Sequence, residues 1–259
     1  MIGAIIGDVV GSRFEFNNHR SKEFELININ SRFTDDTVLT IAIMDWLTNS
    51  LIKDEAHAAK YLQKWARKYP YSGYGGMFRR WINSDNPQPY GSYGNGAAMR
   101  ISPVGWIAKN PKSIKIISDI ATRVTHNHPE GMKGAEVTAQ LITYARFGKT
   151  KEELKEYAEQ FYDLDFDYES LKKNYEFNET CQNTVPQAIY CFLISKDFED
   201  CLRTSVSIGG DTDTLCAISC AIAEAYYKYI PESLVEAVRN KLTPEMLKVI
   251  DDFDKRFCR

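Results

Sequence analysis

The chain has 259 residues, of which 44% are hydrophobic and 26% charged, and its formal net charge is -3. A chain of this length can bury a large core without disulfide bonds to hold it together. The mildly acidic balance and the lack of a basic tract argue against a nucleic-acid partner. No apolar run reaches the roughly 18 residues that a membrane span requires.

The cysteines and the N-terminus indicate the compartment. None of the six cysteines belongs to a C-x-x-C pair, and several lie in apolar stretches, where reduced cysteine packs as a small hydrophobic residue. The first residues, M-I-G-A-I-I-G-D, include no basic segment, and Asp8 follows too early for a secretory signal. We therefore expect a cytoplasmic protein with structural thiols.

Helices are predicted along most of the chain. Gly3, Gly7 and Gly11 are four residues apart in an apolar segment, so a helix over 2–10 has one smooth face for close packing. Residues 17–31 are polar and irregular, as in a loop, and 26–29 is the best candidate for a short strand. Thr34 is expected to cap the next helix. Further helices are expected at 54–68, at 75–81, from 97 onward, and at 113–124, 129–146, 151–162, 181–195, 198–207, 231–239 and 244–257, with 163–179 as a surface excursion.

The segment 207–227 is expected to lie at the centre of the domain. Its helical part, 215–227, is almost wholly apolar, and Glu224 is its one charged residue. A helix that is apolar on most faces belongs in the interior of a domain. Long helices with short connections, and no convincing alternating strands, predict an all-α fold with a single domain over residues 1–259.

Two segments place several oxygen side chains at the start of a buried helix. They are T-D-D-T at 34–37 and D-T-D-T at 211–214. One good N-cap needs a single Asp, Ser or Thr, so both segments exceed what capping requires. If the two helix starts converge, their carboxylates repel one another unless they are protonated or neutralised by divalent cations. The alternative is two independent and unusually polar caps.

Five motifs in this order and spacing resemble the ADP-ribosylglycohydrolase family, which includes the dinitrogenase reductase activating glycohydrolase and ADP-ribosylhydrolases. They are G-D-V-V-G-S-R-F-E-F, T-D-D-T, Y-G-N-G-A-A-M-R, T-H-N-H and G-G-D-T-D-T. Each motif alone is weak, but the five together are specific, and the resemblance runs from about Ile2 to about Tyr227.

The resemblance implies an orthogonal helical bundle with a cleft for two Mg²⁺ ions, or Mn²⁺, since oxygen ligands suit both. It implies the metal ligands Thr34, Asp35, Asp36, Asp211, Asp213 and Thr214. It implies a substrate site formed by Ser92, Tyr93, Gly94, Asn95, Gly96, His126, Ile208, Gly209 and Gly210. Glu15 matches the glutamate that approaches the metals and the ribose, and we expect Glu15 and Asp36 to position or activate the attacking water.

The residue types fit this chemistry. Breaking a ribosyl bond builds positive charge on the sugar, which a nearby carboxylate stabilises. The Gly94-Asn95-Gly96 loop lacks Cβ atoms that would block diphosphate oxygens. Tyr93 offers a ring for adenine stacking, or else packs in the core. Arg100 is expected to have a structural role.

The expected function is therefore Mg-dependent hydrolysis of the bond between ADP-ribose and a modified acceptor. An inactive ADP-ribose-binding module is the alternative, and a metal-dependent phosphohydrolase ranks lower because no histidine accompanies the acidic motifs. Arginine, serine, a nucleic-acid base or a small molecule all suit the same pocket as acceptor. The loops 17–31 and 69–90 are expected to form the acceptor side, in a protein with no membrane partner and a plausible monomeric state.

Overall fold

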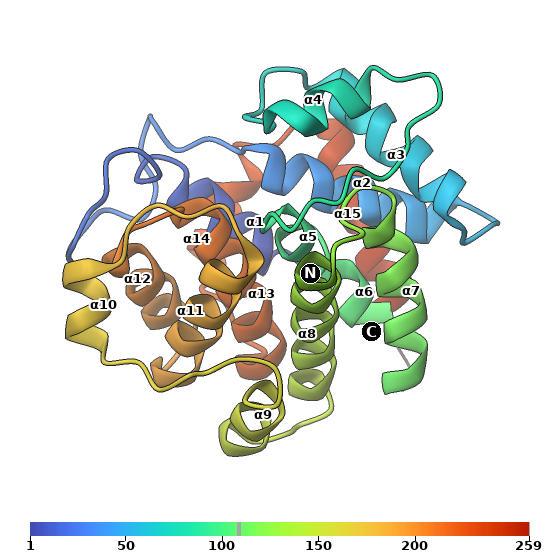
Figure 1. The fold of residues 1–259 in the computed structure, drawn as a ribbon. Helices are drawn as coiled ribbons and strands as arrows, with labels where there is room; N and C mark the ends of the chain where they lie inside the picture. The colour runs from blue at the N-terminus through green and yellow to red at the C-terminus, as the bar shows by residue number, and fades with distance from the viewer. Residues whose placement is uncertain (108–109, 259) are drawn as a thin grey trace.

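The computed structural model describes residues 1–107 and 110–258, which form fifteen helices and no strand (Figure 1). The predicted all-α fold is confirmed. The helices are α1 (Gly3–Gly11), α2 (Asp35–Asn49), α3 (Glu55–Lys68), α4 (Gly76–Ile82), α5 (Gly96–Met99), α6 (Ser102–Ile107), α7 (Pro111–Arg123), α8 (Pro129–Arg146), α9 (Lys151–Ala158), α10 (Tyr168–Asn174), α11 (Cys181–Ile194), α12 (Phe198–Ile208), α13 (Thr212–Tyr227), α14 (Glu232–Arg239) and α15 (Pro244–Phe257).

The strand candidate at 26–29 is wrong, since these residues form no ladder with another strand among the described residues. Asn28 N–H donates to the Ser31 hydroxyl within the loop, and Asn28 C=O accepts from Ser31 N–H and from the distant Lys241 Nζ. Residues 17–31 form the expected loop.

Two helical segments differ from the predictions. The helix expected from Ala97 is divided into α5 and α6, and Pro103 occupies the first turn of α6, where its missing N–H costs nothing. The surface excursion at 163–179 contains α10, which Asp167 caps by accepting a hydrogen bond from Ser170 N–H. A helix of seven residues is too short to show a periodic pattern in the sequence.

Helix α13 is the central helix of the fold. It packs against α1, α8, α11 and α12, and Figure 1 shows these helices around it. Every residue from Thr212 to Ala223 is buried, as the apolar sequence predicts. Helix α13 is therefore held in place on several sides, and the site described below lies at its N-terminal end.

The glycine face of α1 sets how closely it approaches α13. A Cβ atom on Gly3 would lie 2.6 Å from the Cys220 carbonyl oxygen, and one on Gly11 would lie 2.5 Å from the Thr212 carbonyl oxygen. A Cβ on Gly7, between them, would overlap the backbone of Cys216. The four-residue glycine spacing thus lets two helix backbones meet without side chains between them.

The structure agrees with two expectations from the sequence, namely structural thiols and no apolar run long enough to span a membrane. All six cysteines are free, and all but Cys258 are buried. Within the described residues, no helix combines the length and the apolar character needed to cross a bilayer.

Candidate functional site

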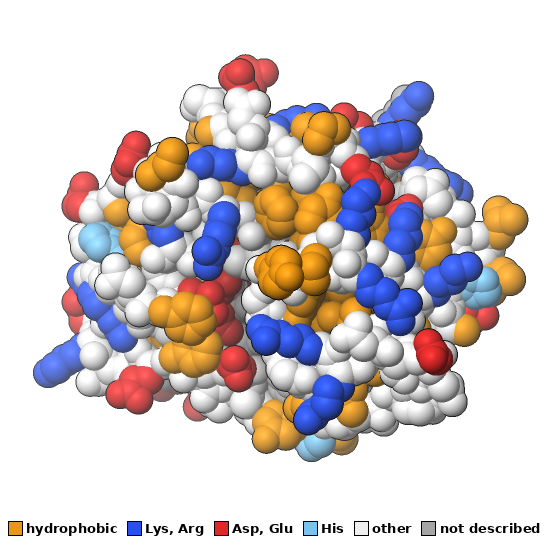
Figure 2. Space-filling view, turned by 90° about the horizontal axis from the view of Figure 1, so that it is seen from above, with side chains coloured by type: hydrophobic (Ala, Val, Ile, Leu, Met, Phe, Trp, Pro, Cys, Tyr) orange, Lys and Arg blue, Asp and Glu red, His pale blue; other side chains and the backbone are white. Residues whose placement is uncertain are grey.

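A cleft of about 740 Å³ opens beside the start of α13. Its floor is acidic, and Figure 2 shows acidic side chains in a hollow of the face seen from above, with hydrophobic side chains beside them. The predicted site residues that line it are Glu15, Asp35, Asp36, Ser92, Tyr93, Gly94, Asn95, Gly96, His126, Asp211, Asp213 and Thr214.

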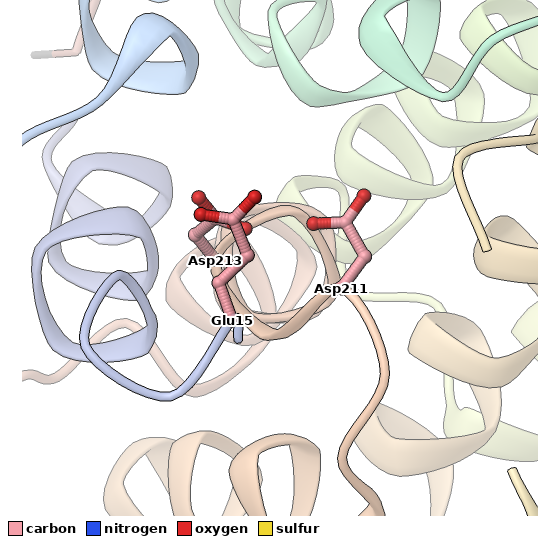
Figure 3. Close-up of side chains that lie close together, drawn as sticks. All are labelled: Glu15, Asp211 and Asp213. Carbon is pink, nitrogen blue, oxygen red and sulfur yellow. The ribbon is translucent and has the colours of Figure 1, made fainter. Parts of the chain in front are cut away.

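Glu15, Asp211 and Asp213 form one carboxylate cluster. Each offers an oxygen that lies within 4.8 Å of the others, and Figure 3 shows Asp211 directed towards the carboxylates of Glu15 and Asp213. Glu15 comes from the loop after α1, whereas the two aspartates flank the start of α13. Three carboxylates at this separation can share one cation as ligands.

The start of α2 is held by a buried carboxylate from α1. Asp8 accepts hydrogen bonds from the backbone N–H and the hydroxyl of both Thr34 and Thr37. The Thr34 hydroxyl also caps α2 by accepting from Asp36 N–H. Asp8 is thus a buried polar partner of the two threonines of the T-D-D-T motif. The two aspartates of the motif, Asp35 and Asp36, line the cleft.

The two acidic helix starts converge, because the Thr214 hydroxyl donates to Asp36 Oδ2 over 3.3 Å. The other oxygen of that carboxylate, Asp36 Oδ1, is buried and has no hydrogen-bond partner in the described structure. A buried acceptor without a donor is costly unless a cation or a water satisfies it. The orphaned oxygen and the all-oxygen donor set therefore fit a hard divalent cation.

The acids of the cleft resist ionisation together. Burial, then Asp213, then Asp8 raises the pKa of Glu15 to about 8, and its hydrogen bond with Asp213 acts in the same direction. Burial raises the pKa of Asp211 to about 6, against the hydrogen bonds it accepts. Burial, followed by the neighbouring carboxylates, raises the pKa values of Asp35, Asp36 and Asp213 well above the ordinary range. A bound cation would reverse these shifts by favouring the ionised forms.

The Ser92–Gly96 loop forms one wall of the cleft. The Asn95 backbone N–H donates to Glu179 C=O, and the Asn95 side-chain amide donates to Asp211 over 2.7 Å. Asn95 therefore orients an acid of the cluster, a contact that sequence spacing did not indicate. Tyr93 is 47% exposed and lies 5.2 Å from the ring of His128, so it is not a core residue and its face is accessible to a planar ligand.

A hydrogen-bond relay sets the tautomer of His126. Arg100 Nη2 donates to the Thr125 hydroxyl oxygen over 2.7 Å, and that oxygen lies 2.7 Å from His126 Nδ1. The hydroxyl proton goes to Nδ1, because its other acceptor, Thr122 C=O, is 3.5 Å away. His126 then carries its proton on Nε2, which faces Gly94 and Gly96.

The charge state of His126 agrees with this relay. Burial, with the charge of Arg100, lowers the pKa of His126 well below its usual value, so the ring is neutral. Arg100 is fully buried, and burial lowers its pKa to about 10. Its Nε and Nη1 atoms find no partner in the described structure, so Arg100 is a buried cation beside the cleft that is not neutralised by an ion pair among the described residues.

Ile208, Gly209 and Gly210 do not line the cleft. Asn18 and Arg20 cover Gly209, and the ring of Tyr175 covers Gly210. The carbonyl oxygen of Ile208 accepts from Arg20. The assignment of these three residues to substrate binding stays a prediction, as do the roles of the other predicted site residues.

Some cleft residues lie in a segment that the sequence assigned to the acceptor side, and others were not indicated. Arg80, from α4, and Tyr90, from the loop before Ser92, line the cleft and fall within 69–90. Phe177 and Thr180 line it from the segment before α11, where no periodic pattern or spaced motif marks a function. Phe177 is 41% exposed.

Comparisons with known proteins agree with the sequence motifs. The family model described as ADP-ribosylglycohydrolase matches residues 1–259. ADP-ribosylhydrolase ARH3 from Homo sapiens is 28% identical over 312 residues, which cover 90% of this chain and 86% of the relative. ADP-ribosyl-dinitrogen reductase glycohydrolase from Rhodospirillum rubrum is 23% identical over 275 residues, which cover 96% of this chain and 92% of the relative.

A solved structure also has this fold. It is an ADP-ribosylglycohydrolase-related protein complex, with a TM-score of 0.77 and 24% identity, and the match covers 98% of this chain and 95% of that chain. The resemblance found in the motifs is thereby confirmed over the whole length. The chain belongs to the ADP-ribosylglycohydrolase family and is a glycosyl hydrolase.

Proposed function

We propose that this chain is a Mg-dependent hydrolase that cleaves the glycosidic bond between ADP-ribose and a modified acceptor, releasing ADP-ribose. One observation supports it above others: acids from α2, from α13 and from the loop after α1 meet on the floor of one cleft, and the Ser92–Gly96 loop forms its wall. We keep a single domain and a cytoplasmic location as parts of this proposal.

Hydrolysis adds the oxygen of water to the anomeric carbon and a proton to the acceptor atom that leaves. A group near the bond must therefore accept a proton from water, and a group must return one. Glu15 and Asp36 are the acids we propose for positioning or activating the water. With cations bound beside it, Glu15 would be held ionised, the form that accepts a proton from the attacking water.

The cluster also has a role in binding. Asp35, Asp36, Asp211 and Asp213, with the hydroxyl of Thr214, would hold the two ions, and the Thr34 hydroxyl is the weakest member because Asp8 and Asp36 N–H already engage it. When bound, magnesium supplies orientation of the ribose hydroxyls and a lowered pKa for water. Glu15, the acid of the cluster that is not among these ligands, would stabilise the positive charge that forms on the sugar as the bond breaks.

The opposite end of the substrate would lie along the Ser92–Gly96 loop. His126 donates from Nε2 to an oxygen of the ligand there, because its tautomer is set by Thr125. Tyr93 presents an accessible ring on which adenine can stack. The relative from Rhodospirillum rubrum is named for a modified protein, so we take an ADP-ribosylated protein side chain as the acceptor class.

The test is release of free ADP-ribose from peptides modified through arginine or through serine. We expect release with Mg²⁺, and loss of at least about a thousandfold in kcat/KM with EDTA or in an Asp35→Ala/Asp36→Ala variant. Asp165→Ala, which removes an exposed aspartate outside the cleft and outside the loops expected to form the acceptor side, is the control and should leave the rate unchanged.

The alternative functions give different results in the same assay. Undiminished release in EDTA contradicts the metal role. Tight ADP-ribose binding by calorimetry, with no turnover of either linkage, would favour the inactive binding module. Release of phosphate instead of ADP-ribose would favour a phosphohydrolase.

A further inference from the structure

A second hollow, of about 480 Å³, adjoins the acidic cleft. Its polar lining consists mainly of two arginines and three asparagines, and we call it the arginine pocket: Arg13, Arg32, Asn17, Asn28 and Asn30. No carboxylate lines it, whereas the cleft beside it has a floor of acids. The two hollows thus differ in the sign of their charge.

Neither arginine of this pocket forms an ion pair with a described residue. Among the described residues, neither Arg13 nor Arg32 lies within 4.0 Å of a carboxylate oxygen. Arg13 stacks over the ring of Phe14 at 4.5 Å and donates to the backbone oxygen of Glu25. Its Nε is buried without a partner, and Arg32 is exposed. The carboxylates that act on the two arginines, Glu25 and Glu15, do so from outside the pocket lining.

An aromatic pair stands between the two hollows. Phe16 lines the arginine pocket and Phe177 lines the cleft, and their ring centroids are 5.7 Å apart. Phe16 is 81% exposed, which is unusual for a phenylalanine and leaves a contact area open to a partner. Glu15, the neighbour of Phe16, belongs to the carboxylate cluster. The aromatic pair and the arginine pocket therefore lie next to Glu15 of the carboxylate cluster.

We propose that the arginine pocket and the Phe16–Phe177 pair bind the peptide that carries the ADP-ribosylated residue, and that they favour an acidic side chain close to that residue. This inference rests on the function proposed above. Unpaired guanidinium groups form strong hydrogen bonds with carboxylates. The three asparagines can pair with the peptide backbone, and the aromatic pair can pack on an apolar side chain.

The observations favour a peptide over the other acceptors. A small conjugate would end within the cleft and reach neither the pocket nor Phe16. A nucleic acid would carry a run of phosphates, but only two arginines face the pocket and the neighbouring floor is acidic. A peptide with one acidic side chain beside the modified residue matches both the cationic pocket and the apolar pair.

The experiment uses the full chain with Mg²⁺ and two sets of peptides, modified through arginine or serine. Within each set the peptides differ only in whether the residues flanking the modification are Glu, Gln or Lys. Release of ADP-ribose gives kcat/KM for each peptide. We expect wild type to prefer the Glu peptide over the Lys peptide by about tenfold, mainly through KM, and to lose this preference as salt is raised.

Two variants, with one control, separate the contribution of charge from that of the aromatic pair to peptide binding. Arg32→Glu should invert the preference between Glu and Lys peptides. The exposed Lys60→Glu changes the net charge equally but lines neither hollow, so it should keep the wild-type preference. Arg32 also acts on Glu15, but any resulting change in kcat affects all peptides and cancels in their ratio. Phe16→Ser should raise KM for every peptide without changing the preference.

The outcomes distinguish this inference from the proposed function. If wild type releases ADP-ribose from Glu, Gln and Lys peptides equally, or if Arg32→Glu leaves the ratio unchanged, the acceptor surface is wrong while the hydrolase remains. Faster release from a modified oligonucleotide than from every peptide would also overturn it. No release from any peptide contradicts the proposed function itself, and this inference with it.

Discussion

The starts of α2 and α13 have nearly the same letters, but different parts of the protein hold them in place. At α2, one buried carboxylate, Asp8, accepts four hydrogen bonds from Thr34 and Thr37. At α13, no side chain caps the helix, and the start is held by backbone contact with α1 at Gly11 and by the amide of Asn95 on Asp211. The start of α2 thus depends on one buried carboxylate, whereas the start of α13 depends on close backbone packing together with hydrogen bonds from the Asn95 amide to Asp211 and from the Thr212 hydroxyl to Gly11 C=O.

One short helix organises both halves of the site, because α1 contacts the starts of both α2 and α13. Helix α1 supplies glycines to α13 on one face and Asp8 to α2 on another, and Glu15 follows shortly after its end. Carboxylates that repel one another must be held rigidly if they are to keep a cation-binding geometry before the cation binds. Helix α1 therefore has a polar attachment, from Asp8 to the start of α2, and a packed attachment, from its glycines to α13. Each can be broken by a separate substitution.

The largest expected effect comes from the packed attachment. Gly7→Val places side-chain atoms where the backbone of Cys216 lies, so α1 and α13 must separate. We expect the free energy of unfolding to fall by more than about 3 kcal/mol, measured by urea unfolding. Gly76→Ala is the control, because nothing lies within 4 Å of its Cβ, and it should leave stability unchanged or slightly higher. Wild-type stability in Gly7→Val would contradict the contact.

The polar attachment comes next. Asp8→Ala leaves four donors of Thr34 and Thr37 without their acceptor in a buried site, so we expect a loss of about 3 kcal/mol and a fall of at least tenfold in kcat/KM. Asp8→Asn retains one acceptor oxygen and should give an intermediate result in both measurements. Wild-type stability in Asp8→Ala would show that Asp8 does not hold α2.

The metal-free protein should lose stability as pH rises from about 4 to about 8. Glu15 and Asp211 have pKa values raised to about 8 and about 6 when folded, so in this window the folded state binds more protons than the unfolded state. Stability therefore decreases with pH in EDTA. Saturating Mg²⁺ should raise Tm by about 5–10 °C at pH 8 and by less at pH 5.5. A Mg²⁺ effect that is larger at pH 5.5 would contradict a cation site built from these acids.

The smallest effect tests the amide at α13. Asn95→Ala removes the donor that lowers the pKa of Asp211, so protons should compete better with Mg²⁺. We expect Mg²⁺ affinity, measured by calorimetry, to fall about fivefold at pH 6.5 and by less at pH 8, as for the loss of one hydrogen bond. Thr184→Val removes the other partner of the Asn95 amide but leaves the contact with Asp211, and it should bind Mg²⁺ nearly as wild type does.

Much of the fold was predictable because its signals are local. Thr34 caps α2, Pro129 opens α8, and the glycines of α1 form a smooth face, each as the sequence predicts. The predictions failed where a helix was too short to show a periodic pattern, as at α10, or where apolar residues in a loop resembled a strand, as at 26–29. Local rules describe caps and periodicity, but they do not show which partner a backbone group will find.

In the sequence, the acidic motifs appear only as a surplus of oxygen side chains at two helix starts. Most helices, the buried central α13, the acids at 34–37 and 211–214 and the family could be predicted from it. The contact of Thr214 with Asp36, the orientation of Asp211 by Asn95 and the position of Phe16 and Arg32 beside the cleft required the folded structure. These contacts join residues far apart in the chain, and their distances depend on the packing of α1 against α13; the glycine spacing predicts that α1 packs closely but does not name its partner.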